Sequence, residues 1–574
     1  MPASISTIAI GIIGAGFAIF SFLRDVLVLV IASCSAFSFI IGLLLVYFLL
    51  TKNQPARTAV FKRQLKRFSI LVPVMIGCTL LLMGIASKQY AVSMLGGLVL
   101  LELVVIEFIL SRTRSRGKIA IVRYFLVLGA VAGNIMFGFL ARGTLPARSG
   151  SQVWKLHVID NPGMVLPNGL DPGDVDKDGF LDYVTNYEWD GNVRVAFHPG
   201  SVDPAILHEP WPAITVGRVA NAESSCLGDV DGDGNLDVAI AHGSELGAAS
   251  GVKVIWGPAA PESKNPSAWQ DGGDMPATVD QGQFHFIRAR DVNGDGRMDL
   301  VIGGRGTNPM AGLKWLEAPA GSVNRRDLAL WDMHEIDPTL ESGHGFQFGD
   351  VDADGDDDIA ICNSDWDTPD ASEMVAWYEN PGDGSPAQQS PWPKRVIYRG
   401  PEFYGKEQVV LHDFSGDGFP EVVMQVADHV YFFINPAVPG LNNNASWSLV
   451  RVAKPDETWQ RCRPIGVADF NNDGNVDILG MLIHSDGYLA ESKATVFWME
   501  HDSTPPLSST WSTHPIKWGD GFSGFSTFNG EKWDMFQVVD VDADGDKDIV
   551  ADCEEFHSFG FVFMAVVWFE NPLL

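Results

Sequence analysis

Hydrophobic positions follow two different patterns along the chain. Residues 1–148 contain five long apolar runs, at 5–23, 26–50, 68–86, 90–110 and 119–140. Each run approaches or exceeds the roughly 20 residues that a membrane-spanning helix needs, which predicts about five such helices. Beyond them the apolar runs are short and alternate with polar residues, which is typical of β-strands. The pattern therefore predicts an α-helical transmembrane domain at 1–148 and an all-β domain at 149–574.

The loops between the apolar runs predict the side of the membrane on which the all-β domain lies. Loop 52–67 carries six basic residues and loop 111–118 carries four, whereas the loop around Lys88 is nearly neutral. Basic loops stay in the cytoplasm, so we expect the last helix to lead the C-terminal domain out of it. The domain would then face the cell surface, the periplasm or a lumen. Whether the first apolar run spans the membrane or re-enters it stays open.

In the second part of the chain, one nine-residue stretch recurs seven times. Its clearest copy is Asp229-Val-Asp-Gly-Asp-Gly-Asn-Leu-Asp237, and the copies begin at Asp174, Asp229, Asp291, Asp350, Asp413, Asp469 and Asp540. Around the copies the same segments recur: a Trp-led strand, an apolar strand before the stretch, a short strand after it and an aromatic strand. Four strands per unit and seven units predict a seven-bladed β-propeller with four-stranded blades.

The ends of the repeat region predict how the ring closes. A Trp-led strand at Trp154 precedes the first copy, and the chain stops just after an aromatic strand that ends in Trp568-Phe-Glu-Asn-Pro572. If each Trp-led strand is the outer strand of the preceding blade, the Trp154 strand completes blade seven. An open array would instead leave exposed strand edges.

The repeated stretch places oxygen side chains at positions 1, 3, 5 and 9 around a glycine that permits a sharp turn. Hard oxygen ligands in this number suit Ca²⁺, whereas Zn²⁺ prefers nitrogen and sulfur. We therefore expect up to seven structural Ca²⁺ ions. Their predicted ligands are Asp174, Asp176, Asp178 and Asp182; Asp229, Asp231, Asp233 and Asp237; Asp291, Asn293, Asp295 and Asp299; Asp350, Asp352, Asp354 and Asp358; Asp413, Ser415, Asp417 and Glu421; Asp469, Asn471, Asp473 and Asp477; and Asp540, Asp542, Asp544 and Asp548.

The alternative is that these aspartates only form Asx turns. Carboxylates this close repel one another when no cation lies between them, and seven copies make the metal interpretation the stronger one. The fifth loop, with Ser415 and Glu421, departs most from the pattern. Since fewer charged ligands weaken Ca²⁺ binding, we expect it to be the poorest site.

The seven stretches and the apolar strands around them resemble the FG-GAP/VCBS repeats of integrin α-subunit propellers and of many bacterial and fungal surface proteins. The resemblance covers about 153–574 and not the membrane part. It implies a propeller with Ca²⁺ in the loops of one face and ligands at the opposite face. Some members of the family are adhesins or scaffolds, and others are polysaccharide lyases or dehydratase-type enzymes.

Charge and cysteine content narrow the class of protein further. The formal net charge is −31, but residues 1–148 carry +12 and the remainder carries −43. Nucleic-acid binding is excluded because it needs clustered basic residues, whereas seven Ca²⁺ would neutralise 14 of the negative charges. Six cysteines are too few for a disulfide scaffold, and we expect Cys226, Cys362, Cys462 and Cys553 to be buried thiols.

A polar ring is predicted at the end of the propeller opposite the metal loops. Six residues before each stretch, where the chain enters the inner strand, every residue is polar: Asn168, Glu223, His285, His344, Glu407, Arg463 and Asp534. Acids, bases and a carboxamide around one axis could line a ligand pocket, which neighbours such as Trp533 would enlarge. Strand ends are mostly polar in any case, so contacts between blades are the alternative.

Together these features favour a membrane-anchored, extracytoplasmic, Ca²⁺-binding propeller that presents a recognition face to a protein or glycan. The alternative function is an anchored sugar lyase or dehydratase, with His285, His344 and Arg463 as acid–base or carboxylate-binding groups. A membrane-embedded sensor is less consistent with the sequence, because only two short loops are predicted in the cytoplasm. The sequence contains no Gly-rich phosphate loop, nucleophile elbow or His-Glu-x-x-His motif.

Overall fold

The computed structural model describes most of the C-terminal part of the chain. It covers residues 154–573, except 165, 189, 244–249, 306–311, 321–323, 342, 344, 364–373, 383–385, 400–407, 427–428, 440, 442–446, 453–461, 483–493, 502–510, 519–530 and 557–561. The chain divides into units at Met1–Ala147 and Arg148–Leu574, and the described residues all belong to the second. The five apolar runs lie outside them. Within the described part, no helix is long and apolar enough to cross a membrane.

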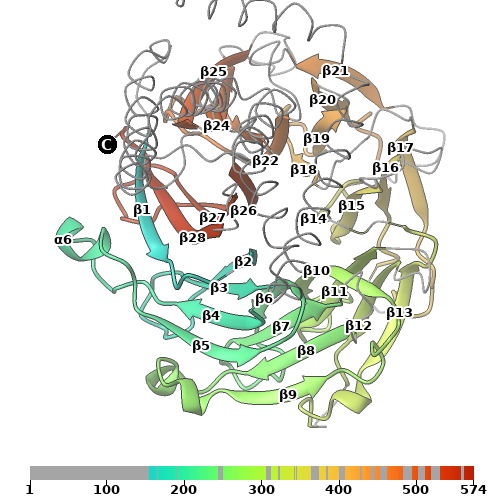
Figure 1. Cartoon of the computed structure of the whole chain (residues 1–574). Coiled ribbons are helices and arrows are strands. Elements are labelled where there is room, and N and C mark those ends of the chain that lie inside the picture. Colours follow the sequence, from blue (N-terminus) through green and yellow to red (C-terminus); the bar gives the residue numbers. More distant parts are fainter. Residues whose placement is uncertain are drawn as a thin grey trace, which may run out of the picture. The chain divides into compact units, whose positions relative to one another are not determined.

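The described strands form seven four-stranded antiparallel sheets that surround a common axis (Figure 1). Blade one contains β2 (Pro167–Gly173), β3 (Asp182–Tyr187), β4 (Asn192–Ala196) and β5 (Ala213–Arg218). Blade two contains β6 (Ala222–Gly228), β7 (Asp237–His242), β8 (Gly251–Trp256) and β9 (Gln270–Asp274). Blade three contains β10 (Gln283–Arg290), β11 (Asp299–Arg305), β12 (Leu313–Glu317) and β13 (Asp332–Asp337).

The remaining blades follow the same order. Blade four contains β14 (Gln347–Gly349), β15 (Asp358–Asn363), β16 (Met374–Tyr378) and β17 (Lys394–Arg399). Blade five contains β18 (Val410–His412), β19 (Glu421–Val426), β20 (His429–Ile434) and β21 (Ser448–Val452). Blade six contains β22 (Cys462–Ala468), β23 (Asp477–Leu482), β24 (Ala494–His501) and β25 (Trp511–Trp518). The predicted seven-bladed propeller with four-stranded blades is confirmed.

Blade seven joins the two ends of the described chain. It contains β26 (Glu531–Val539), β27 (Asp548–Phe556) and β28 (Val562–Glu570), and its outer strand is β1 (Lys155–Asp160). β1 pairs antiparallel with β28, so that His157 lies opposite Trp568. The predicted closure by the Trp154 strand is confirmed. Blade seven therefore has all four strands, whereas the last blade of an open ring would lack its outer strand and expose an edge.

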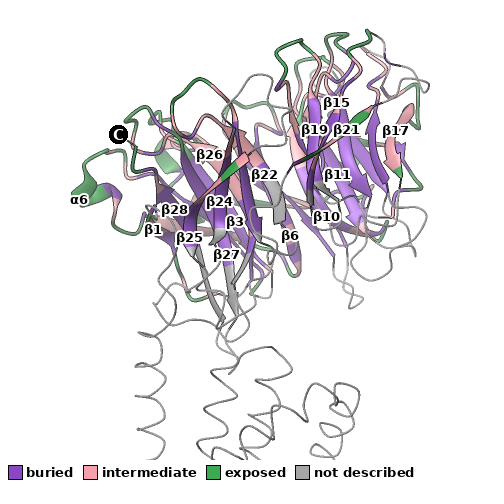
Figure 2. Ribbon diagram, turned by 90° about the horizontal axis from the view of Figure 1, so that it is seen from above, coloured by how far each residue is buried: buried purple, intermediate pink, exposed green. Residues whose placement is uncertain are grey.

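The core lies between adjacent blades, where the faces of neighbouring sheets pack together. The second and third strands of the blades are mostly buried, whereas outer strands such as β9 and β17 are partly exposed (Figure 2). Trp315, Trp377 and Trp568 of the aromatic third strands are completely buried. Each of these side chains contributes on the order of 3 kcal/mol through the apolar area it removes from water. Apolar side chains from neighbouring blades thus pack into shared clusters and hold the ring together.

Two sequence predictions about buried residues have different outcomes. Cys226, Cys362 and Cys553 are buried thiols, as predicted, while the side chain of Cys462 lies outside the described ones. Trp533, by contrast, is completely buried in an apolar cluster and packs against Phe569 at 5.5 Å between ring centroids. The prediction that it enlarges a ligand surface is wrong, because its large apolar ring is turned into the blade.

Ion pairs cross the seams between some blades. Asp337 at the end of β13 accepts hydrogen bonds from Tyr378 Oη (2.6 Å) and Lys394 Nζ (2.7 Å), both of blade four. Asp160 at the end of β1 has the equivalent place at the seam between blades seven and one, where Arg194 of β4 donates to it at 2.6 and 3.0 Å. Both aspartates are buried, so these pairs fix how the outer strand of one blade sits against its neighbour.

Candidate metal loops

The repeated aspartates lie in the loop between the first and second strands of every blade. Position nine is always the first residue of the second strand: Asp182, Asp237, Asp299, Asp358, Glu421, Asp477 and Asp548. All seven side chains are buried. In blade two, Asp237 Oδ2 accepts the backbone N–H of Val230 (3.0 Å) and Oδ1 accepts that of Gly257 (2.7 Å). Position nine therefore ties the loop to the end of the third strand.

The other aspartates fold the loop around their own carboxylates. In blade one, Asp174 accepts the backbone N–H groups of Asp178 (3.0 Å) and Gly179 (3.1 Å), and Asp178 accepts that of Phe180 (3.0 Å). Gly179 has a φ of +95°, a conformation that glycine adopts without strain. The predicted alternative of Asx turns is thus present. Such turns use the carboxylates as acceptors and still leave some of their oxygens directed into the loop.

Carboxylates converge inside four of the loops. Within the described residues, three carboxylate oxygens lie within 4.8 Å of one another in each of these sets: Asp174, Asp176 and Asp182; Asp229, Asp231 and Asp237; Asp350, Asp352 and Asp358; and Asp540, Asp542 and Asp544. These are the four loops that keep aspartate at all the predicted ligand positions. Unscreened carboxylates at this separation repel one another by several kcal/mol.

Three of these loops contain a buried oxygen that has no hydrogen-bond partner in the described structure. They are Asp229 Oδ1 in blade two, Asp352 Oδ1 in blade four and Asp540 Oδ1 in blade seven. A buried carboxylate oxygen without a partner is costly. A hard cation bound in the loop would coordinate it, so the residues present fit Ca²⁺.

Burial and crowding also raise the pKa values of the loop carboxyls. The pKa of Asp182, Asp237 and Asp299 is raised to about 7, mainly by burial and in part by neighbouring loop carboxylates, although backbone N–H groups lower it. The pKa of Asp358 reaches about 9 for the same reasons. The negative charge of these loops is therefore unfavourable without a cation.

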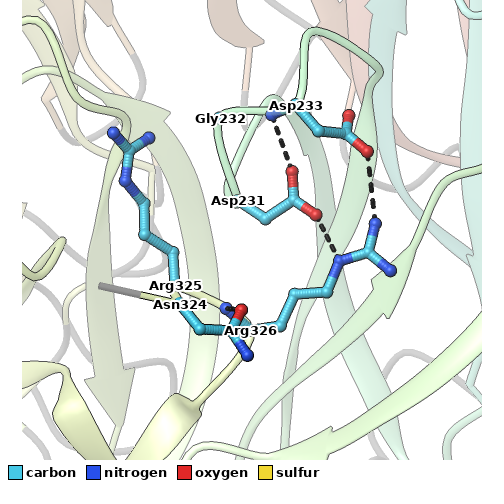
Figure 3. A pocket seen from close by; sticks show the side chains of 6 residues that line it. All are labelled: Asp231, Gly232, Asp233, Asn324, Arg325 and Arg326. Carbon is cyan, nitrogen blue, oxygen red and sulfur yellow. Dashed lines mark hydrogen bonds and ion pairs between the residues drawn. The ribbon is translucent and has the colours of Figure 1, made fainter. Parts of the chain in front are cut away.

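Basic side chains of the following blade reach two of the loops. Lys264, between β8 and β9, lies 2.5 Å from Asp176 of blade one. Arg326, between β12 and β13, pairs with Asp231 and lies 3.2 Å from Asp233 of blade two (Figure 3). Arg326 lines a cavity of about 320 Å³ beside this loop. Sequence reasoning missed both basic residues, because they lie between copies of the repeat and follow no periodic pattern.

Asparagines after the third strand connect neighbouring loops. Asn571 Nδ2 donates to the carbonyl of Phe470 in the preceding blade's loop (3.0 Å) and to that of Lys547 in its own loop (3.1 Å). Asn380 and Asn435 make the equivalent pairs of bonds. The sequence signal for these asparagines is the Asn-Pro pair that recurs after the aromatic strand. In the sequence this pair identified the repeat but not the contact between loops.

Residues 350–424, from the fourth loop to β19, match the FG-GAP-like repeat family model. The chain carries an FG-GAP-like repeat. Together with the seven-bladed fold, this confirms the resemblance found in the sequence. The match includes two of the seven loops, so the aspartate stretch is part of the family pattern.

Two solved structures are among those that match this chain. The propeller of Dos1 is 11% identical, with a TM-score of 0.34, over 74% of this chain and 96% of that one. The V. cholerae biofilm matrix protein Bap1 is 12% identical, with a TM-score of 0.23, over 70% of this chain and 55% of that one. The chain thus spans about half the length of Bap1. No curated protein matches the chain.

The predicted polar ring is described in part. Asn168, Glu223, His285 and Asp534 lie near the starts of the inner strands β2, β6, β10 and β26, at the ends away from the metal loops. His344 and Glu407 are outside the described residues. Arg463 lies in β22, and its side chain is not among those described.

The structure brings two residues of this set together. His285 Nδ1 lies 3.7 Å from Glu223 Oε2, and their side chains are only 7% and 12% exposed. In both strands the register shifts at this residue, between Ala222 and Ser224 and between Phe284 and Phe286. A β-bulge redirects the side chain of the extra residue. The bulges thus place an acid and a base beside each other on adjacent inner strands.

Proposed function

We propose that the protein is a Ca²⁺-stabilised recognition module, held in a membrane by residues 1–148 with its propeller outside the cytoplasm. The observation that carries the calcium part is the set of buried, unpartnered oxygens of Asp229, Asp352 and Asp540, which recur in three blades of the ring. Equivalent loops in all seven blades would hold up to seven ions. Each ion would offset two negative charges of its loop and fix the turn between the first two strands.

The location outside the cytoplasm agrees with this chemistry. Extracellular Ca²⁺ modules bind with dissociation constants of about 10⁻⁴–10⁻³ M, far weaker than cytosolic buffers. The exposed loops here, several of them with Asn or Ser replacing Asp, fit that weaker class. Calcium at the concentration found outside cells would fill such sites.

The recognition face is proposed at the opposite end, around Glu223 and His285. Both side chains are largely buried on inner strands and offer a carboxylate and an imidazole at one place. Together with Asn168 and Asp534 they supply the hydrogen-bonding groups that glycan hydroxyls or polar peptide groups need. His344, Glu407 and Arg463 would complete the ring.

A glycan array probed with the full-length protein at millimolar Ca²⁺ tests this face. We expect binding without product formation, and we expect the double variant Glu223→Ala/His285→Ala to lose it while melting at the wild-type temperature. His514→Gln, which alters a histidine on an outer strand, is the matched control. Binding that survives the double substitution would refute the proposed face. Release of unsaturated sugar would instead favour a lyase.

A further inference from the structure

Two histidines and a glutamate converge at the outer edge of the ring, between blades seven and one. His157 lies in β1, Glu570 ends β28, and His208 follows the short helix α6 (Pro204–Leu207), which lies beside β1 in Figures 1 and 2. Glu570 Oε2 is 2.6 Å from His157 Nε2 and 3.6 Å from His208 Nε2. Both Nε2 atoms therefore face the same carboxylate oxygen.

The pair of His157 and Glu570 is itself a repeated feature of the fold. His334 in blade three contacts Glu317 at 2.9 Å, and His514 in blade six contacts Glu500 at 2.6 Å. In each case the imidazole stacks on a tryptophan of the third strand, with ring centroids 4.2–4.7 Å apart. A single His–Glu pair is therefore part of the blade architecture.

Blade seven differs because the connection between β4 and β5 of blade one supplies a second imidazole. The rings of His157 and His208 stack at 3.9 Å between centroids, with an interplanar angle of 26°. Among the described residues, neither of the other two pairs belongs to a group of three histidine, cysteine or carboxylate ligand atoms that all lie within 4.8 Å of one another. Residue 208 thus converts a structural pair into a set of three ligands.

We propose that His157, His208 and Glu570 bind a zinc-type transition-metal ion. Two imidazoles and one carboxylate are a common zinc ligand set, with water in the fourth position. Metal–ligand bonds of about 2.0–2.2 Å in tetrahedral geometry separate ligand atoms by about 3.4 Å. Glu570 Oε2 lies 2.6 Å from His157 Nε2 and 3.6 Å from His208 Nε2, so the two observed distances lie on either side of this value. The ion would replace the proton between His157 and Glu570.

Lys155 is the group that the ion must displace. Its Nζ lies 3.3 Å from Glu570 Oε2 and 3.2 Å from His208 Nδ1. The Lys155 side chain is 62% exposed, so it can turn into solvent when a dication binds. Its positive charge weakens metal binding, and removing that charge should strengthen it. The open side left by Lys155 provides room for the water ligand.

Zinc titration of the full-length protein in saturating Ca²⁺ tests the proposal, since the aspartate loops are then filled. Calorimetry should show one Zn²⁺ site, and Co²⁺ at that site should give the visible absorption of tetrahedral coordination. His208→Ala should weaken binding on the order of tenfold or more. Lys155→Ala should strengthen it. The matched control His334→Ala, which breaks an equivalent pair without a second histidine, should bind as wild type.

Several results would overturn the site. The wild type could fail to bind Zn²⁺, or His208→Ala could bind Zn²⁺ as tightly as the wild type. Loss of Zn²⁺ binding in His334→Ala would equally contradict the proposal. His208 lies in the connection between β4 and β5 and not in a strand, so its substitution should change the melting temperature in Ca²⁺ little. His208→Gln repeats the test with a side chain of similar length. The gain expected for Lys155→Ala provides a readout that misfolding cannot imitate.

Discussion

Arg326 lies where the proposed Ca²⁺ of the second loop would bind, so it would compete with that ion. Its guanidinium pairs with Asp231 and Asp233, which are predicted ligands of the second loop. We expect Arg326→Gln to raise the Ca²⁺ affinity of this loop roughly two- to fivefold, because a partly exposed ion pair contributes up to about 1 kcal/mol. The Arg326 guanidinium lies 5.3 Å from the ring of Trp256, so tryptophan fluorescence during Ca²⁺ titration reports on this loop.

Lys253→Gln is the matched control for this prediction. Lys253 pairs with Asp271 at 2.9 Å, within blade two but outside the aspartate loop. Its replacement removes the same charge from the domain without altering the second loop. If both variants shift the titration equally, only the general charge of the domain matters and direct competition by Arg326 is refuted.

For single residues, the sequence indicates well which aspartates share a loop, but it indicates poorly which residues from elsewhere contact them. The spacing of Asp229, Asp231 and Asp237 follows from the turn itself, so it can be recognised within nine residues. Arg326 is 95 residues from Asp231, and only the packing of blade three against blade two brings them together. The same holds for Glu223 and His285, whose orientation depends on two bulges that no local pattern indicates.

At the scale of strands and blades, the seam between blades three and four should give a measurable pH dependence. Burial alone would raise the pKa of Asp337, but hydrogen bonds from Lys394, Thr339 and Tyr378 outweigh it and lower the pKa below its usual value. Because the Asp337 carboxyl ionises more readily in the folded protein, its charge stabilises the fold at pH values above the unfolded pKa of about 4. That stability is lost as the pH falls through the lower, folded-state value.

We therefore compare wild type with Asp337→Asn at constant, saturating Ca²⁺. Near neutral pH the variant should be destabilised by about 2 kcal/mol, since hydrogen bonds to a charged group are lost. The difference in melting temperature between the two proteins should shrink as the pH falls below about 4. A difference that stays constant down to the lowest pH at which the protein folds would show that the charge of Asp337 does not stabilise the seam.

The elements themselves were largely predictable because each blade repeats one order of strands. Alternating apolar residues indicated the strands, and the spare Trp154 strand indicated how β1 completes blade seven. The role of Asn571 was not predictable, since its amide links carbonyls in two different blades. Such contacts depend on how blades pack, which a pattern within one repeat does not contain. The prediction for Trp533 was wrong because a bulge between Trp533 and Phe536 turns its side chain into the core, and the repeat pattern does not show this bulge.

For the whole molecule, the balance of charge leads to the strongest test of the calcium proposal. The part of the chain after residue 148 carries a net charge of −43 when no ion is bound. At a Ca²⁺ concentration ten times the dissociation constant, each site adds about 1.4 kcal/mol to stability, so seven sites would add about 10 kcal/mol. Chelation should therefore lower the melting temperature of the full-length protein strongly, as followed by tryptophan fluorescence.

The response to salt distinguishes calcium binding from a general effect of ionic strength. Without Ca²⁺, added NaCl should raise the melting temperature, because it screens the repulsion between the carboxylates. In saturating Ca²⁺ the same NaCl should have less effect, since the bound ions already offset much of the repulsion between the loop carboxylates. Mg²⁺ at equal concentration should restore little stability, because it keeps its waters and demands strict octahedral geometry. If NaCl or Mg²⁺ stabilises the chelated protein as fully as Ca²⁺ does, the loops are not calcium sites and the aspartates act only as turn formers.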